Sequence, residues 1–349
     1  MVSIYFHPDG YTSRGRQVMG RHIAGETFLK AYLKYSTTKS FALQLESPSH
    51  LEVFRSIRKE ANSRIAVETI TRSSFKKLSK YGVSFYPGPG LSEWAQMRSF
   101  YGHSRWSLCG ITHTIASDRA MDAISDLITY PIQPWDALIC TSSAVQQSVK
   151  SILDRNIDYL RCRFKASKFP VPQLPIIPLG VDQASFQFSK EERLQSRNEF
   201  GIANDEVVVL YVGRLSFHAK ANPYPMYKSL QKSVEITGKK VVLIECGWFY
   251  NESIEAAFTE SQKLLSPSVR LVRVDGRQQK SLRMAWSSAD IFCSFADNIQ
   301  ETFGITPLEA MASGLPVVVS DWNGYKETVR DQVDGFRVKT SAPTADAKQ

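Results

Sequence analysis

The second half of the chain alternates short apolar runs with amphipathic stretches. Residues 206–216 begin with a continuous run of β-branched residues and reach Gly213, which is typical of a strand buried on both faces. The next stretch, 222–238, has a helical pattern that Gly238 would end. The remaining predicted strands are 239–248, 269–276, 291–296 and 315–321, and the remaining predicted helices are 251–265, 281–290 and 306–314. Because strands and helices alternate, we expect an α/β fold with a doubly wound parallel sheet and right-handed crossovers.

The first half shows the same alternation more faintly. Its predicted strands are 2–8, 106–114 and 135–143, and its predicted helices are 22–35 and 142–164. The last two strands end in polar residues, as buried strands do where they reach a cleft. Ser142 or Ser143 is the expected N-cap of the long helix. A second α/β domain is therefore predicted.

Two domains also fit the length, because 349 residues exceed the usual size of a single core. Four prolines lie between Phe169 and Pro178, and proline-rich stretches mark linkers. We therefore expect an N-terminal domain over 1–178 and a C-terminal domain over 179–340. The polar end, 341–349, is expected to be a disordered tail.

Composition narrows the class of protein. There is no run of eighteen apolar residues and no pattern of a secretory signal at the start, so we expect a cytoplasmic protein that is at most peripheral to a membrane. The five cysteines are scattered, without the spacing of a zinc site, and are expected to be reduced and mostly buried.

The net charge of +9 predicts an anionic partner: a nucleotide phosphate, an anionic membrane surface or nucleic acid. Basic residues gather over 155–168 and at Arg14, Arg16 and Arg21. Each group is equally well explained as a solvated surface, and no nucleic-acid-binding motif is present, so nucleic acid is not the expected partner.

The segment between the strand at 291–296 and the helix at 306–314 is the main candidate for chemistry. Glu301 and Glu309 are separated by seven residues, and Gly304 precedes the expected helix. A helix N-terminus after a parallel strand can bind phosphate, and the two carboxylates can accept hydrogen bonds from sugar hydroxyls. The local alternative is a capping box, with Thr306 as N-cap and Glu309 bonding back to its amide.

Two cations follow another strand of the same domain. Arg214 and Lys220 come after the strand that reaches Gly213, so they would lie at the same sheet edge as Glu301. There they would stabilise a diphosphate leaving group as its negative charge develops. Alternatively, both are solvated surface charges.

Four ordered segments resemble the retaining glycosyltransferases of family 4, also called glycosyltransferases group 1, which have the GT-B fold of two facing Rossmann-like domains. The segments are "IIPLGVDQASF" (176–186), with Leu179 where Asn is common; "YVGRL" (211–215) with Lys220, at a spacing one residue longer than the commonest; "SADIFCSFADNIQETFGITPLEAMASGLPVVVSD" (288–321); and "NGYKETVRDQVDGF" (323–336). The resemblance is strong over 176–338. In the first half it is weaker and rests on "CGITHT" (109–114) and the first glycine-containing loop.

The resemblance implies roles for individual residues. Glu301 would bind hydroxyls of the donor sugar, and Glu309 would bind the nucleotide ribose. Backbone contacts to sugar and phosphates would come from Phe303, Gly304 and Ile305, while Arg214 and Lys220 would neutralise the diphosphate. His113, which by itself is as easily structural, would lie near the reacting face of the donor sugar. Gly20 or Gly15 would approach the phosphate from the N-terminal domain.

The resemblance also implies the reaction. A hexosyl group would pass from a nucleoside-diphosphate sugar to a hydroxyl of a glycan, lipid or small molecule, with retention of configuration. We expect no cofactor and no obligatory metal, because no Asp-x-Asp signature is present. The alternatives are another GT-B sugar-nucleotide enzyme and a non-catalytic anion-binding protein.

Members of this family usually continue beyond the segment that ends at Phe336. We therefore expect the usual C-terminal helices to be missing and an apolar patch to be exposed where they would dock.

Overall fold

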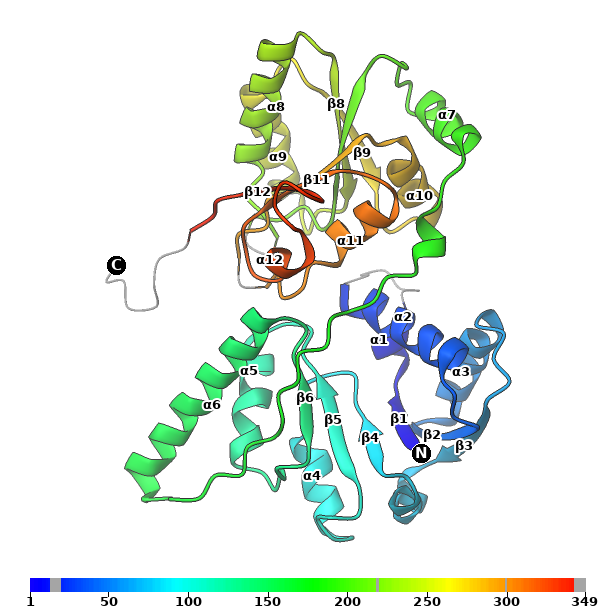
Figure 1. The fold of residues 1–349 in the computed structure, drawn as a ribbon, viewed down its shortest axis with the longest axis vertical. Helices are drawn as coiled ribbons and strands as arrows, with labels where there is room; N and C mark the ends of the chain where they lie inside the picture. The colour runs from blue at the N-terminus through cyan, green and yellow to red at the C-terminus, as the bar shows by residue number, and fades with distance from the viewer. Residues whose placement is uncertain (13–19, 218–219, 299, 342–349) are drawn as a thin grey trace. The chain divides into compact units, whose positions relative to one another are not determined.

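The structure is a computed structural model that describes residues 1–12, 20–217, 220–298 and 300–341. The chain divides into two compact units, Met1–Gly180 (unit 1) and Val181–Gln349 (unit 2) (Figure 1). Each unit is a parallel sheet covered by helices on both faces. The predicted α/β class with two Rossmann-like domains is therefore confirmed. Gly15 lies outside the described residues, and so does the predicted tail from residue 342 onward.

Unit 1 contains a six-stranded sheet in the order β3-β2-β1-β4-β5-β6. Its strands are β1 (Val2–Phe6), β2 (Ser40–Leu45), β3 (Ala66–Ile70), β4 (Val83–Phe85), β5 (Ser107–Ile111) and β6 (Ala137–Ile139). Its helices are α1 (Pro8–Tyr11), α2 (Gly20–Tyr35), α3 (Pro48–Glu60), the 3-10 helix η1 (Arg72–Lys80), α4 (Ser92–Ser99), α5 (Asp118–Ser125), the 3-10 helix η2 (Asp126–Ile128) and α6 (Ser143–Phe164). Successive strands lie on opposite sides of β1 and β4, which makes the gap between these two strands the topological switch point.

Two apolar cores hold the layers of unit 1 together. One core joins the sheet to α1, α2 and α3, with Leu29 and Phe54 fully buried. The other joins it to α4, α5 and α6, with Ala95 and Val149 fully buried. Ser142 caps α6 by accepting a hydrogen bond from the amide of Val145, as one of the two predicted caps.

Unit 2 repeats this topology, with strand order β12-β11-β10-β7-β8-β9. Its strands are β7 (Val207–Val212), β8 (Val241–Gly247), β9 (Arg270–Asp275), β10 (Ile291–Ser294), β11 (Val317–Ser320) and β12 (Gly335–Val338). Its helices are the 3-10 helix η3 (Gln183–Phe186), α7 (Lys190–Glu199), α8 (Tyr224–Thr237), α9 (Glu252–Leu265), α10 (Gln279–Ser288), α11 (Ile305–Ala312) and α12 (Tyr325–Thr328). The switch point lies between β7 and β10.

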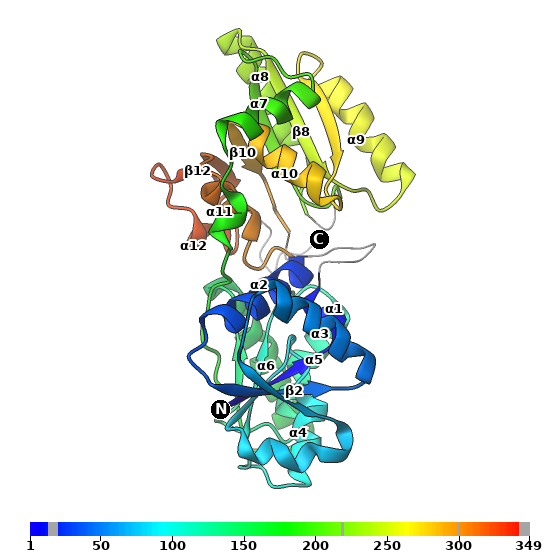
Figure 2. The ribbon, with the colours of Figure 1, turned by 90° about the vertical axis from the view of Figure 1, so that its right-hand side faces the viewer.

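The helices of unit 2 also cover both faces of its sheet (Figure 2). Tyr227 of α8 and Phe258 of α9 are buried against one face. Trp286 of α10 and Ala310 of α11 are buried against the other. Gly238 ends α8 in the left-handed conformation, as predicted from its position after the helical pattern.

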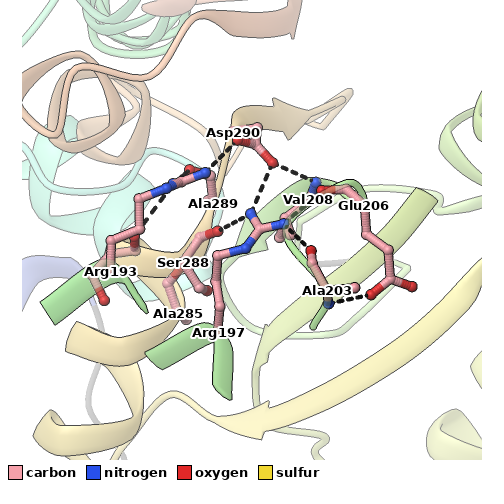
Figure 3. Close-up of polar contacts among 10 residues, drawn as sticks. Arg193, Arg197, Ala203, Glu206, Val208, Ala285, Ser288, Ala289 and Asp290 are labelled. Carbon is pink, nitrogen blue, oxygen red and sulfur yellow. Dashed lines mark hydrogen bonds and ion pairs between the residues drawn. The ribbon is translucent and has the colours of Figure 1, made fainter. Parts of the chain in front are cut away.

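A half-buried carboxylate joins the two strands that border the switch point of unit 2. Asp290 precedes β10, and its carboxylate accepts a hydrogen bond of 2.8 Å from the amide of Val208 in β7. Arg193 and Arg197 of α7 both bond this carboxylate (Figure 3). Arg197 also donates to the carbonyl groups of Ala203 and Glu206, 2.6 Å from each, which ties the segment before β7 to the same cluster.

Unit 1 has a similar arrangement. Asp136 precedes β6, accepts the amide of Leu108 in β5 at 2.8 Å and binds both terminal nitrogens of Arg98. Both side chains of this ion pair are fully buried. Asp136 also accepts the amide of Gln133, and Arg98 donates to the carbonyl of Trp106, but Nε of Arg98 is buried without a hydrogen-bond partner.

Several local expectations were wrong or incomplete. The helix after β10 begins at Ile305, with Gly304 at the cap position and no side-chain capping bond, so the predicted capping box of Thr306 and Glu309 is absent. Strands β2, β3, β4 and β12 were not predicted. Edge strand β12 leaves Phe336 61% exposed. Within the described residues, no helix combines the length and apolar character needed to span a bilayer.

Candidate active site

The loop between β10 and α11 lies at the switch point of unit 2, beside the loop that follows β7. Lys220 from the second loop and Glu301 from the first form an ion pair, with Nζ and Oε2 3.0 Å apart. Arg214, two residues after β7, donates from Nη2 to Oε1 of Gln300 at 3.4 Å. The structure therefore brings both predicted cations to the segment that contains Glu301.

Backbone geometry explains how the segment before α11 is shaped. Gly304 has φ of +77°, and a Cβ there would lie 1.9 Å from Cε1 of Tyr325. The adjacent Gly324 allows similarly close contact, because a Cβ on it would lie 2.5 Å from Cα of Phe303. Tyr325 is itself held by a 3.0 Å hydrogen bond to Ser294 at the end of β10. Glycine is required at Gly304 for the chain to pass this ring, and at Gly324 for the close approach to the backbone of Phe303.

Three side chains that sequence reasoning did not single out hold the loop from outside. Asn298 donates to the carbonyl of Lys220, which joins the loops after β10 and β7. Trp322 donates from Nε1 to the carbonyl of Asn298 at 2.9 Å, and Asn323 donates to the carbonyl of Glu301 at 2.8 Å. The signal for Asn323 was its place at the start of "NGYKETVRDQVDGF", one of the four segments that carry the family resemblance.

Helix α11 presents an uncapped N-terminus at this loop. No side chain bonds its first amides at the cap position, and its first turn contains no acidic residue. The first amides of a helix have no partner within the helix, and the dipole adds positive potential there. Phe303, Gly304 and Ile305 therefore lie where backbone contacts to an anionic group are predicted, although Phe303 directs a buried side chain into the protein.

Glu309 lies one turn into α11 and is buried, with 8% of its surface exposed. Burial raises the pKa of its carboxyl to about 7. No ion pair to this carboxyl is present among the described residues, whereas the buried Glu301 is neutralised by Lys220. The two glutamates of the motif thus differ in their surroundings: Glu301 has a cationic partner, whereas burial without such a partner raises the pKa of Glu309.

Aromatic and cationic side chains lie at the ends of the neighbouring strands. Trp248 follows β8, and the guanidinium groups of Arg214 and Arg277 lie 6.0 and 5.9 Å from its ring centroid. Arg277 also forms an ion pair with Asp275 at 2.9 Å. These contacts place Arg214 between the ring of Trp248 and the loop after β10, so its side chain is oriented from both sides.

The two remaining predicted site residues belong to unit 1. His113 follows β5. Its pKa is lowered to about 4, mainly by burial and to a smaller extent by the charges of Arg21 and His22. Its imidazole is therefore neutral at pH 7. Gly20 is exposed and begins α2, with open space where a Cβ would be added. Among the described residues, no group of three or more His, Cys, Asp or Glu side chains could hold a metal ion.

Comparisons with known proteins agree with the geometry of unit 2. Residues 192–349 match the family model of the Glycosyl transferases group 1. An uncharacterized glycosyltransferase of Methanocaldococcus jannaschii is 28% identical over 287 residues, which are 77% of this chain and 66% of the relative. Unit 2 is therefore similar to the glycosyltransferase group 1 family. A D-inositol 3-phosphate glycosyltransferase of Nocardia farcinica is 26% identical over 50% of this chain and 39% of its own length.

Solved structures show the fold. HepE of Anabaena in complex with UDP has a TM-score of 0.63 at 16% identity, covering 97% of this chain and 85% of that one. Sucrose-phosphate synthase of Thermosynechococcus elongatus has a TM-score of 0.54 at 18% identity, covering 97% and 85%. The two parallel-sheet units therefore have the GT-B architecture. The chain aligns with two thirds or less of the length of the curated relatives described above.

Proposed function

We propose that the chain is a metal-independent, retaining glycosyltransferase of family 4 that moves a hexosyl group from a nucleoside-diphosphate sugar to an acceptor hydroxyl. One observation carries the proposal: at the switch point of unit 2, the Lys220–Glu301 ion pair lies at the uncapped start of α11, which also carries the buried Glu309. Cations and helix amides suit a diphosphate, and carboxylates suit sugar hydroxyls. The UDP and UDP-glucose complexes of HepE make a uridine donor the first choice for testing.

The ion pair suggests how the donor would bind. Glu301 is the group that Lys220 contacts when no donor is present. A diphosphate that approaches the amides of α11 would compete for Lys220, and Arg214 would add a second cation. Glu301 would then accept hydrogen bonds from hydroxyls of the sugar. One loop would thus make charge-assisted hydrogen bonds to both the diphosphate and the sugar of the donor.

Glu309 suits the ribose. A ribose diol donates two hydrogen bonds, and such donors favour the ionised carboxylate. A carboxyl whose pKa burial has raised to about 7 would therefore release its proton as the nucleotide binds near neutral pH. Replacement of Glu309 would weaken binding of every nucleotide with a ribose, whatever its base.

The proposed reaction uses the donor phosphate as its base. The acceptor oxygen attacks the anomeric carbon on the face from which the diphosphate leaves. The bond between that carbon and the phosphate oxygen breaks, and the acceptor proton passes to the departing phosphate. Lys220, Arg214 and the amides of α11 stabilise the negative charge that develops on the leaving group. His113 is assigned to the donor sugar, as a neutral imidazole at pH 7.

The test uses UDP-glucose, with water as the acceptor, and follows the glucose released by NMR. The α-anomer should appear first, because retention from this donor gives the α-product. Lys220→Met should lower the rate at least 100-fold, whereas Lys232→Met, at an exposed position on α8, should not change it. EDTA should have no effect.

Other outcomes would reject parts of the proposal. The β-anomer as first product would contradict retention, and loss of rate in EDTA would contradict metal independence. Conversion of UDP-glucose to an epimer without release of UDP would identify a different sugar-nucleotide enzyme. Binding to generic DNA that Arg214→Ala leaves unchanged, without turnover of any nucleotide sugar, would favour the non-catalytic anion-binding protein.

A further inference from the structure

Unit 1 has two adjacent cavities of opposite character that share Pro87 and His113. One cavity, of about 280 Å³, lies at the switch point of the unit and is lined by polar side chains. The other, of about 190 Å³, is lined mostly by apolar side chains. In open α/β sheets the switch point is where ligands bind, so the polar cavity is a ligand site by its position.

The polar cavity is formed by the loops after β1 and β4. Asp9 of α1 forms an ion pair with Arg21 at 3.0 Å, and its carboxylate also lies 3.4 Å from Nε2 of His22. Arg119 of α5 adds a second guanidinium to the lining. A carboxylate and two guanidinium groups can accept from and donate to several hydroxyl groups at once.

Aromatic rings also line the same cavity. Trp94 packs against Tyr86 with ring centroids 4.6 Å apart and against Tyr5 at 4.9 Å. All three residues line the cavity. Aromatic rings beside hydroxyl-binding groups suit a polar ring such as a sugar or a cyclic polyol.

The apolar cavity lies between α2 and the ends of β4, β5 and β6. Phe85, Ile111 and Ile139 line it from the strands. Ala24 and Ala31 line it from α2, where small side chains leave the space open. Along its remaining side runs the segment 177–180, in which Ile177 is 48% exposed.

Helix α2, which lines the apolar cavity, packs closely against the loop that lines the polar cavity. A Cβ on Gly25 of α2 would lie 1.9 Å from the carbonyl oxygen of Gly10, which itself lines the polar cavity. The helix is thus fixed against the loop after β1. A ligand in the polar cavity has His113 and Pro87 at its edge, and a chain attached to that ligand would pass these residues into the apolar cavity.

We propose that the acceptor is an amphiphile, with a hydroxyl-bearing head group in the polar cavity and a hydrocarbon chain in the apolar cavity. The inference rests on the proposed function for the role of acceptor, but the pair of cavities stands on its own geometry. A wholly polar acceptor would leave the apolar cavity filled with water, whereas a hydrocarbon chain would displace it. Each buried methylene should tighten binding about threefold to fourfold.

The experiment measures binding of two probes to the full chain by calorimetry: methyl β-D-glucoside and n-octyl β-D-glucoside, the second below its micellar concentration. The octyl compound should bind at least 100-fold more tightly. Ala31→Phe, which fills the apolar cavity, should remove this preference. Ala256→Phe adds the same ring at an exposed position on α9 and should leave it unchanged.

A second variant guards against misfolding. Ile177→Asn removes apolar lining at a half-exposed position and should reduce the octyl preference without unfolding unit 1. Equal binding of both glucosides, or an octyl preference that neither Ala31→Phe nor Ile177→Asn reduces, would overturn the inference. UDP binding is measured on the same samples. Its absence beside a cavity-dependent octyl preference would reject the proposed transferase while leaving the amphiphile site in place.

Discussion

At the scale of single residues, the two glutamates of the motif have different surroundings. Glu301 has Lys220 as a partner, whereas burial alone governs Glu309 and raises its pKa to about 7. A carboxyl whose folded pKa exceeds its unfolded value stabilises the fold at low pH, and this contribution is lost as pH rises through the folded pKa. Without a bound donor, the buried Glu309 therefore lowers the free energy of unfolding at neutral pH.

The first prediction concerns this cost. Glu309→Gln removes the ionisable group, so unfolding free energy should fall less between pH 4.5 and pH 8 in the variant than in the parent chain. A shift from 4.5 to about 7 corresponds to a difference of roughly 3 kcal/mol. Urea unfolding at the two pH values measures it. The exposed Glu260→Gln on α9 is the control, and identical pH dependence in all three proteins would contradict the assignment.

At the scale of elements, the start of α11 depends on a glycine that packs against α12. Gly304 and Gly314 have nearly equal φ values, +77° and +76°, but only the first faces an obstruction. The backbone strain of a Cβ is therefore the same at both positions, whereas the clash with Tyr325 occurs at one. Substitution of each glycine in turn therefore distinguishes the effect of backbone strain from the effect of the clash with Tyr325.

Gly314→Ala should accordingly destabilise the chain by about 1–2 kcal/mol without weakening nucleotide binding. Gly304→Ala should destabilise it more, because the ring of Tyr325 must move, and should weaken UDP binding at least tenfold. Thermal unfolding and calorimetric titration of the two variants test this. Equal loss of affinity in both would show that the contact with Tyr325 does not shape the site.

At the scale of the whole molecule, each unit is secured by a carboxylate that precedes one strand and bonds the neighbouring strand. Asp136 does this in unit 1 and Asp290 in unit 2. The Arg98–Asp136 pair is fully buried, so removing one partner would leave an uncompensated charge away from water. The stability of unit 1 should depend on this pair far more than on any surface ion pair.

Asp136→Ala should therefore lower the unfolding free energy by about 3–5 kcal/mol. Asp158→Ala, which breaks an exposed ion pair with Arg161 on α6, should cost less than about 1 kcal/mol. Urea unfolding followed by tryptophan fluorescence compares them. An equally small effect of both changes would mean that Arg98 is accommodated by its carbonyl partners alone.

Much of the fold could be predicted because local signals agree with tertiary structure in unit 2. Its buried strands are continuous apolar runs, and Gly238 ends α8 where the helical pattern stops. Three of the missed strands lack that signal: β3 is half-exposed at the sheet edge, and β4 and β12 have only three and four residues. Strand β2 is an exception, because its six residues are mostly buried inside the sheet. Short strands at an edge cannot be distinguished from loops by periodicity.

The candidate site was predicted in its residue types but not in its local structure. Thr306 and Pro307 carry the sequence signature of a helix start, yet the left-handed Gly304 lets the helix begin at Ile305. The ring that fills the space beside Gly304 belongs to Tyr325 of α12, about twenty residues later. Such contacts have no local pattern in the sequence.

The central claim is that the edge of unit 2 binds a nucleoside diphosphate through Glu309 and Lys220. Thermal unfolding of the full chain with millimolar UDP, GDP, ADP and CMP in parallel tests it most directly. One of these nucleotides should raise the unfolding midpoint, since a ligand at a hundred times its dissociation constant stabilises by about 2.7 kcal/mol. The shift should vanish in Glu309→Gln and Lys220→Met and persist in Glu260→Gln. No shift with any nucleotide, or one that survives both site changes, would contradict the account.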